Sequence, residues 1–129
     1  MWITRICLAL QEAFILPYRV DACGPYWRYE VIIVAGHFVV DPDQREQFLD
    51  SRADMMRASR SEADCISYAF SPDPLDASRV LLFERWESKA ALAGHLAGLR
   101  QRPPRQDGVE VQESEVQQYE ISAIGPVGS

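Results

Sequence analysis

The stretch from Tyr29 to Val40 constrains the fold more than any other part of the sequence. From Val31 onward it is apolar or small at every position except His37, and it is rich in the β-branched residues that favour strands. Because successive side chains of a strand point to opposite faces, this strand is apolar on both of them. The two alternating sets are Val31, Ile33, Ala35 and Val39 on one face, and Ile32, Val34, Phe38 and Val40 on the other. We therefore expect a sheet whose two faces are both covered.

A helix is expected directly after this strand. Asp41 suits the N-cap, and Pro42 suits the first helical position, where a missing N–H costs nothing. The helix is predicted over about residues 42–60, with Phe48 and Met56 on its buried side.

A second strand and a hairpin loop follow the helix. Residues 65–71 alternate, which predicts a strand with Ile66, Tyr68 and Phe70 on one face. Residues 72–78 hold two prolines and several turn-forming residues, so we expect a loop there.

The third strand runs into the second helix, and this junction is where we expect the functional site. Residues 80–86 are typical of a strand, and Ser88 suits the N-cap of a helix extending to about Gln101. Alternation places Glu84 and Trp86 on the same face of the strand. Helical spacing predicts an apolar stripe with His95 inside it, formed by Leu92, Leu96 and Leu99. A carboxylate, an indole and an imidazole are thus directed into the space between sheet and helix.

The last strand is predicted over residues 116–124, with Tyr119 and Ile121 on one face. The element order is then β-α-β-β-α-β, which is the ferredoxin-like α+β fold: a four-stranded antiparallel sheet with two helices on one face. The helices leave the second apolar face uncovered. We therefore predict a homodimer in which two sheets pack face to face.

The bulk composition indicates one domain, over residues 29–125, preceded by an extension over residues 1–28. The net charge of −6 and the absence of a basic stripe argue against nucleic acid and anionic membranes as partners. No apolar run is long enough to span a bilayer. The three cysteines, Cys7, Cys23 and Cys65, are widely separated, so the sequence indicates neither a disulfide framework nor a zinc site. Such cysteine usage agrees with a cytoplasmic location.

These features together resemble the antibiotic biosynthesis monooxygenase family, which has the dimeric α+β barrel fold. The resemblance covers residues 30–124. It is carried by the first strand, by Cys65-Ile66-Ser67-Tyr68, and by Glu84-x-Trp86-x-Ser88 followed by Ala91-Leu92-x-x-His95. The chain departs from the family at Ala63-Asp64, where many members carry Pro-Gly.

The resemblance implies a small oxygenase that uses neither metal nor flavin and acts on a quinol or another phenolic aromatic molecule. The family also includes haem-degrading relatives and members whose activity is unknown. Two alternatives therefore stay open: a dimeric barrel of the stress-response kind that binds a small ligand without chemistry, and a haem-handling protein.

Each candidate residue has a functional role and a structural alternative. His95 is the candidate general base, although a core-edge histidine bonded to a backbone carbonyl is the favoured alternative. Trp86 can stack on an aromatic substrate and can also be a core residue at the junction of sheet and helix, and Tyr68 can offer its hydroxyl to the pocket or simply pack. Glu84 can orient His95 or bind a substrate hydroxyl, although a structural role, pairing with a basic residue or capping the second helix, is the favoured alternative. His37 matches loosely a pocket-lining position of the haem-degrading relatives, and a half-exposed strand-end histidine is the favoured alternative. An iron site would need His37, His95 and Glu84 to converge, which no spacing in the sequence requires.

Overall fold

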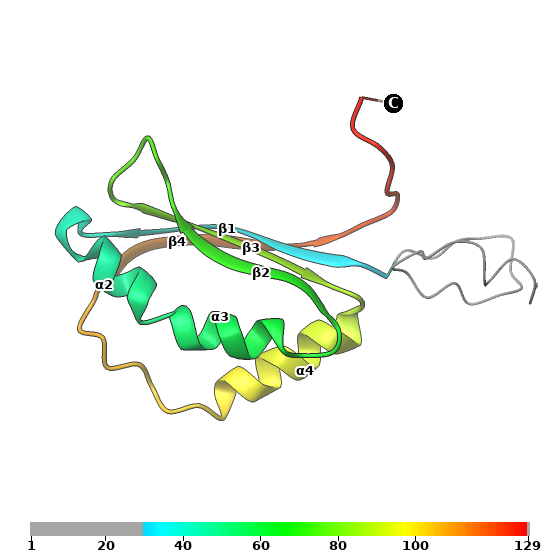
Figure 1. Ribbon diagram of the computed structural model, residues 1–129, viewed down its shortest axis with the longest axis horizontal. Helices are drawn as coiled ribbons and strands as arrows, with labels where there is room; N and C mark the ends of the chain where they lie inside the picture. Colours follow the sequence, from blue (N-terminus) through cyan, green and yellow to red (C-terminus); the bar gives the residue numbers. More distant parts are fainter. Residues whose placement is uncertain (1–29, 129) are drawn as a thin grey trace, which may run out of the picture.

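A computed structural model describes residues 30–128, and it shows the predicted β-α-β-β-α-β order (Figure 1). The elements are β1 (Ile32–Val40), η1 (Pro42–Gln44), α2 (Arg45–Asp50), α3 (Ala53–Arg60), β2 (Cys65–Pro72), β3 (Arg79–Trp86), α4 (Lys89–Arg100) and β4 (Val111–Glu120). The strands form one sheet in the order β2-β3-β1-β4, and every neighbouring pair is antiparallel. The ferredoxin-like α+β fold is therefore confirmed. The expected extension over residues 1–28 lies outside the described residues.

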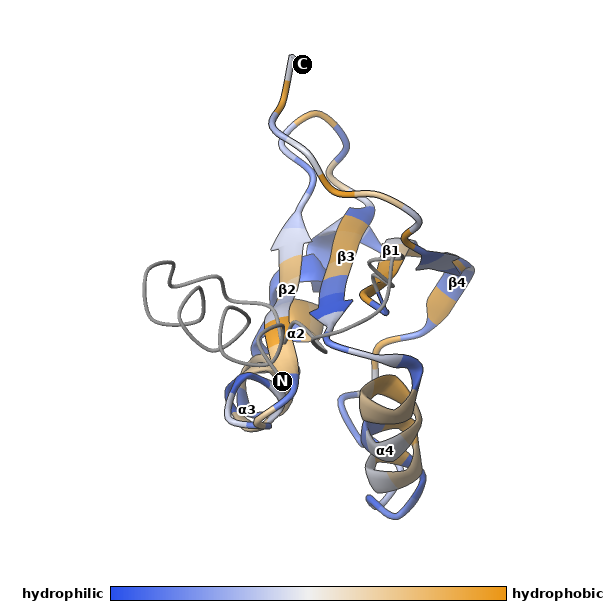
Figure 2. Cartoon of the chain, turned by 90° about the vertical axis from the view of Figure 1, so that its right-hand side faces the viewer, coloured by the Kyte–Doolittle hydropathy of each residue, from blue (hydrophilic) through white to orange (hydrophobic). Residues whose placement is uncertain are grey.

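Helices α3 and α4 lie on the same side of the sheet, as Figures 1 and 2 show from two directions. Within residues 30–128, no helix is both long and apolar enough to cross a bilayer.

The helix starts follow the local sequence. The Asp41 side chain accepts a hydrogen bond from the N–H of Asp43, and Pro42 occupies the first position of η1. The Ser88 side chain accepts from the N–H of Ala91 at the start of α4. Both predicted N-caps are confirmed, and each satisfies a backbone donor that the first helical turn leaves without a partner.

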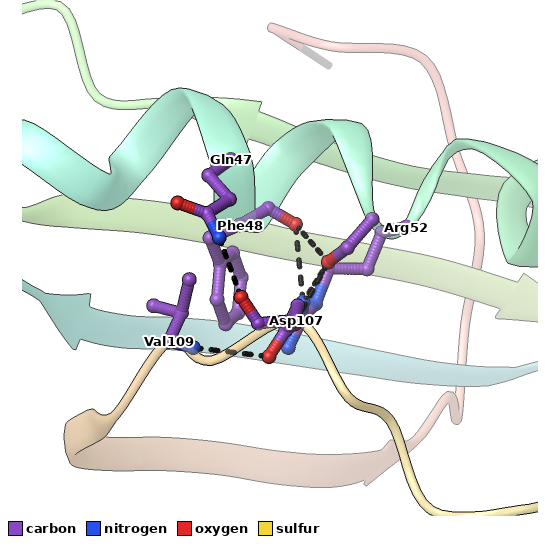
Figure 3. A network of polar contacts seen from close by, with 6 residues as sticks. Gln47, Phe48, Arg52, Asp107 and Val109 are labelled. Atoms are coloured by element: carbon purple, nitrogen blue, oxygen red, sulfur yellow. Dashed lines mark hydrogen bonds and ion pairs between the residues drawn. The ribbon is translucent and has the colours of Figure 1, made fainter.

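The single helix predicted over residues 42–60 is wrong, because the structure divides it into η1, α2 and α3 with an interruption at Ser51 and Arg52. The Arg52 side chain is buried at this interruption, where its guanidinium lies over the Phe48 ring and contacts Asp107 (Figure 3). Asp107 belongs to the loop between α4 and β4. Through Arg52, the interruption thus connects that loop to the end of α2.

Two details of the strands also differ from the prediction. The last strand covers Val111–Glu120 rather than residues 116–124, because its pairing with β1 begins at Val111, opposite Val40. Ile66 does not share a face with Tyr68 and Phe70, since the β2–β3 register shifts between Cys65 and Ser67. This bulge turns Cys65, rather than Ile66, towards the core.

The core lies between the sheet and the helices in two clusters. One joins Ile32, Tyr68, Trp86 and Leu92, and the other joins Val40, Phe48 and Val80. The stripe predicted on α4 is partly wrong, because Leu96 is exposed while Leu92 and His95 are buried. The two core clusters also show which face of β1 the helices cover. The residues on that face are Ile32, Val34, Phe38 and Val40.

The other set of β1 residues lies on the opposite, outer face of the sheet. Phe83 and Tyr119 pair with Ala35 and Ile33 there, and they are 41% and 47% exposed. In the described part of the chain, no helix covers this face (Figure 1). Within residues 30–128, the outer face is therefore partly apolar and is not covered by a helix.

Candidate functional site

Four of the five residues that the sequence singled out come together between the sheet and α4. Tyr68 on β2 pairs directly with Glu84 on β3, and Trp86 lies two residues further on the same face. His95 reaches the group from α4. Alternation along β3 and the helical period of α4 are sufficient to produce this arrangement.

Three rings of this group pack against one another. The Trp86 and His95 ring centroids are 4.5 Å apart with an interplanar angle of 34°. Tyr68 lies 5.4 Å from His95 and 6.3 Å from Trp86, centroid to centroid. Trp86 is completely buried, so its indole already serves as a packing surface for the imidazole. Direct stacking on a substrate would require the indole to move.

Glu84 is a buried carboxylate with an internal partner. It is only 5% exposed, and its Oε2 accepts a hydrogen bond of 2.8 Å from Trp86 Nε1. Burial raises the pKa of Glu84, and the bond from Trp86 and the neighbouring His95 oppose that rise. Burial, reinforced by the Glu84 carboxylate, raises the pKa of Tyr68 well above its ordinary value. Tyr68 therefore keeps its proton at neutral pH and can act as a hydrogen-bond donor.

His95 is oriented by Glu62, a residue that the sequence did not identify. The distance between His95 Nδ1 and Glu62 Oε1 is 2.9 Å. A carboxylate can only accept, so Nδ1 carries a proton, and in the neutral imidazole Nε2 then presents a lone pair. His95 Nε2 is buried and has no hydrogen-bond partner in the described part of the chain. The imidazole thus has one nitrogen fixed and one free to accept a proton.

A depression of about 300 Å³ opens beside this pair. It lies between the turn that joins α3 to β2, at Glu62 and Asp64, and the start of α4, from its N-cap Ser88 to Gly94. Trp86 and His95 form its inner wall. The depression is open to solvent, and its rim carries carboxylates. His95 is thus part of the lining of a depression that solvent can enter.

His37 does not belong to this group. It pairs with Leu81 on β3 and with Glu115 on β4, and these three side chains lie on the outer face of the sheet. His37 and His95 are therefore on opposite faces, and the sheet between them prevents one chain from placing both on a single metal ion. The prediction that His37 lines the same pocket as the other four residues is therefore wrong.

Comparison with known proteins adds a family and a set of similar structures. The family model described as antibiotic biosynthesis monooxygenase matches residues 31–102. An uncharacterized protein from Synechocystis sp. is 36% identical over 88 residues, which are 68% of this chain and 60% of that protein. The chain thus matches about 60% of the length of that curated relative.

Solved structures show the same fold at lower identity. A proposed antibiotic biosynthesis monooxygenase from Nitrosomonas europaea is 18% identical with a TM-score of 0.61, covering 80% of this chain and 99% of that one. A similar protein from Deinococcus radiodurans is 19% identical with a TM-score of 0.55, covering 75% and 99%. At these identities the likeness establishes the fold alone.

Proposed function

The chain belongs to the antibiotic biosynthesis monooxygenase family, and on this premise we propose that it oxygenates a quinol or another phenolic small molecule without a metal or flavin. The observation that carries the proposal is His95, whose Nδ1 is held by Glu62 while its buried Nε2 lacks a partner. A buried nitrogen with a free lone pair is the group that such a reaction needs as a base.

The first step is removal of the phenolic proton. Oxygen reacts slowly with closed-shell organic molecules, and deprotonation makes a phenol electron-rich enough to supply the electrons itself. His95 Nε2 takes the proton, and the Glu62 carboxylate stabilises the imidazolium that forms. Because the His95 side chain is only 1% exposed, we expect substrate binding to open the contact between the α3–β2 turn and α4.

The oxygenation then balances without any other reductant. For a substrate whose keto form has a ring CH₂, this carbon and O₂ give a carbonyl and water. One oxygen atom enters the product, and the other leaves with both hydrogens. Tyr68 keeps its proton and is the proposed hydrogen-bond donor to the anion, once substrate binding gives access to its hydroxyl. Buried Glu84 accepts a hydrogen bond from the Trp86 indole and thereby fixes its orientation.

We also propose that the outer face of the sheet binds a second copy of the chain. Phe83 and Tyr119 lie exposed on this face, beside Ile33 and Ala35 of β1. An apolar sheet face of this kind favours self-association, because a two-fold axis lets one patch cover the other.

Oxygen uptake with a panel of hydroquinones and polycyclic phenols tests the catalytic proposal. We expect uptake above the buffer rate with at least one substrate, and a loss of roughly 10²- to 10⁴-fold in His95→Ala, the range that a general base contributes. Glu62→Gln should lose less, because it leaves the imidazole in place without its carboxylate. Glu87→Gln removes an exposed charge near the site and should retain wild-type activity.

Two results would contradict the proposal. One is equal uptake in the wild type and His95→Ala. The other is thermal stabilisation by a phenolic compound with no turnover, which would identify a ligand-binding protein instead.

A further inference from the structure

A second group of potential ligands lies on the outer face of the sheet, away from His95. It consists of His37 on β1 and of Glu113 and Glu115 on β4. Each offers one nitrogen or oxygen atom, and these atoms lie within 4.8 Å of one another. The His37 Nε2 and Glu113 Oε1 atoms are 3.9 Å apart. The proposed oxygenase reaction uses none of these residues.

The backbone fixes the spacing of the three side chains. His37 pairs directly with Glu115, and Glu113 pairs with Val39 two residues along the same face. Cross-strand neighbours on one face hold their Cβ atoms about 5 Å apart. The strands are pressed together here, because a Cβ at Gly36 would lie 1.9 Å from the Glu115 carbonyl oxygen. The site is therefore built on two paired strands, the inner strand β1 and the edge strand β4, rather than on a loop.

The site brings two carboxylates close to one imidazole on the same face of the sheet. Glu113 Oε1 approaches His37 Nε2, and among the ion pairs observed within residues 30–128 none joins Glu113 or Glu115 to a Lys or Arg. The nearby Arg79 is directed to Asp73 and Asp76 instead. The two carboxylates together carry a charge of −2 when ionised, which a divalent cation would neutralise.

We propose that His37, Glu113 and Glu115 bind a divalent transition-metal cation. One imidazole nitrogen and two carboxylate oxygens are ligands that suit Zn²⁺, Co²⁺ or Mn²⁺. Metal–ligand bonds of about 2.0–2.2 Å place neighbouring ligand atoms about 3.3 Å apart in a tetrahedral site. Reaching that spacing from the observed one requires the side chains to rotate towards one another. The three ligands approach from one side, so the remaining positions are open.

A cation bound at this position would affect the proposed packing of two chains. The same sheet face is the proposed contact with a second copy, and packing there would take the two carboxylates out of water. A bound cation would offset this cost. The metal site itself depends on the geometry of one chain, and it stands whether or not the oxygenase proposal holds.

Titration of the full chain with Co²⁺ tests this inference. We expect visible absorption bands that saturate at one Co²⁺ per chain, without the thiolate bands that binding by cysteine would produce. His37→Ala and Glu115→Gln should each weaken binding by on the order of tenfold or more. Glu120→Gln is the matched control, because it removes one charge from the same strand on the other face and should leave binding unchanged.

Two outcomes overturn the inference: no saturable spectral change in the wild type, or equal binding in His37→Ala. Circular dichroism of each variant establishes that it is folded. Since His37 and His95 lie on opposite faces, the oxygen-uptake assay is expected to be unaffected by His37→Ala, which separates the two proposals.

Discussion

Replacing Asp107 by Asn should destabilise the protein strongly, because it leaves a buried cation without its counter-ion. Arg52 Nη1 donates to Asp107 Oδ2 at 2.7 Å and to the Phe48 carbonyl at 3.1 Å (Figure 3). The Arg52 side chain is 2% exposed, and its guanidinium carbon lies 3.2 Å from the centroid of the Phe48 ring. Asp107 also accepts from Ser51 Oγ and from the N–H of Val109.

Two lines of reasoning give the magnitude. Removing one partner of a buried ion pair costs about 3–5 kcal/mol, and Asn retains one acceptor, so we expect about 3 kcal/mol. Burial alone would raise the pKa of Asp107, but the hydrogen bonds from Arg52, Ser51 and Val109 and the Arg52 charge outweigh it and lower the pKa from 3.8 to about 2. At 1.36 kcal/mol per pKa unit, that difference corresponds to about 2 kcal/mol.

Equilibrium urea unfolding followed by circular dichroism measures this loss. The double variant Arg52→Met/Asp107→Asn should recover most of it, because a buried pair replaced by apolar groups is often nearly neutral. Asp54→Asn is the control: its contact with Arg57 is exposed on both sides, and its removal should cost less than about 0.5 kcal/mol. A loss below 1 kcal/mol in Asp107→Asn, or a double variant less stable than the single one, would refute the reasoning.

The same carboxylate predicts the pH dependence. Since folding lowers the pKa of Asp107, its contribution to the free energy of unfolding is complete above the unfolded pKa of about 3.9. It disappears as the pH falls through about 2. The stability difference between wild type and Asp107→Asn should therefore shrink between pH 5 and pH 2.

Two further predictions concern the sheet. Gly36→Ala would place a Cβ 1.9 Å from the Glu115 carbonyl oxygen, so the β1–β4 pairing must shift, and the free energy of unfolding should fall by about 3 kcal/mol or more. Gly98→Ala, in open space on α4, is the control and should raise the free energy of unfolding by about 0.5–1 kcal/mol. An unchanged free energy of unfolding in Gly36→Ala would contradict the close β1–β4 packing. Phe83→Glu should convert a dimer into a monomer in size-exclusion chromatography with light scattering, whereas Leu75→Glu, in an exposed loop, should not; a monomeric wild type would exclude the sheet-face dimer.

Much of the fold follows from local sequence. The N-caps at Asp41 and Ser88 and the alternation of β3 agree with the structure because each depends on residues within one turn or strand. The polar edge strand β4 was displaced in the prediction, since its pairing with β1, rather than its own pattern, sets its bounds. The interruption at Arg52 depends on Asp107, far along the chain, and no local pattern reveals it.

The residues of the candidate site also differ in whether local sequence or a distant contact determines their position. Tyr68, Glu84, Trp86 and His95 were identifiable because strand alternation and helical period determine which way they point. Glu62 was not, because its contact with His95 spans 33 residues and a turn whose conformation the sequence leaves open. His37 was misplaced because both faces of β1 are apolar, so the sequence could not show which one the helices cover.

The most direct test of the central claim is the fate of oxygen. With ¹⁸O₂ and a substrate that supports uptake, we expect one ¹⁸O atom in the trapped product and one in water for the wild type, and no labelled product for His95→Ala. Unlabelled product with hydrogen peroxide formed instead would show a simple oxidation, and labelled product at an equal rate from His95→Ala would show that the imidazole is not the base.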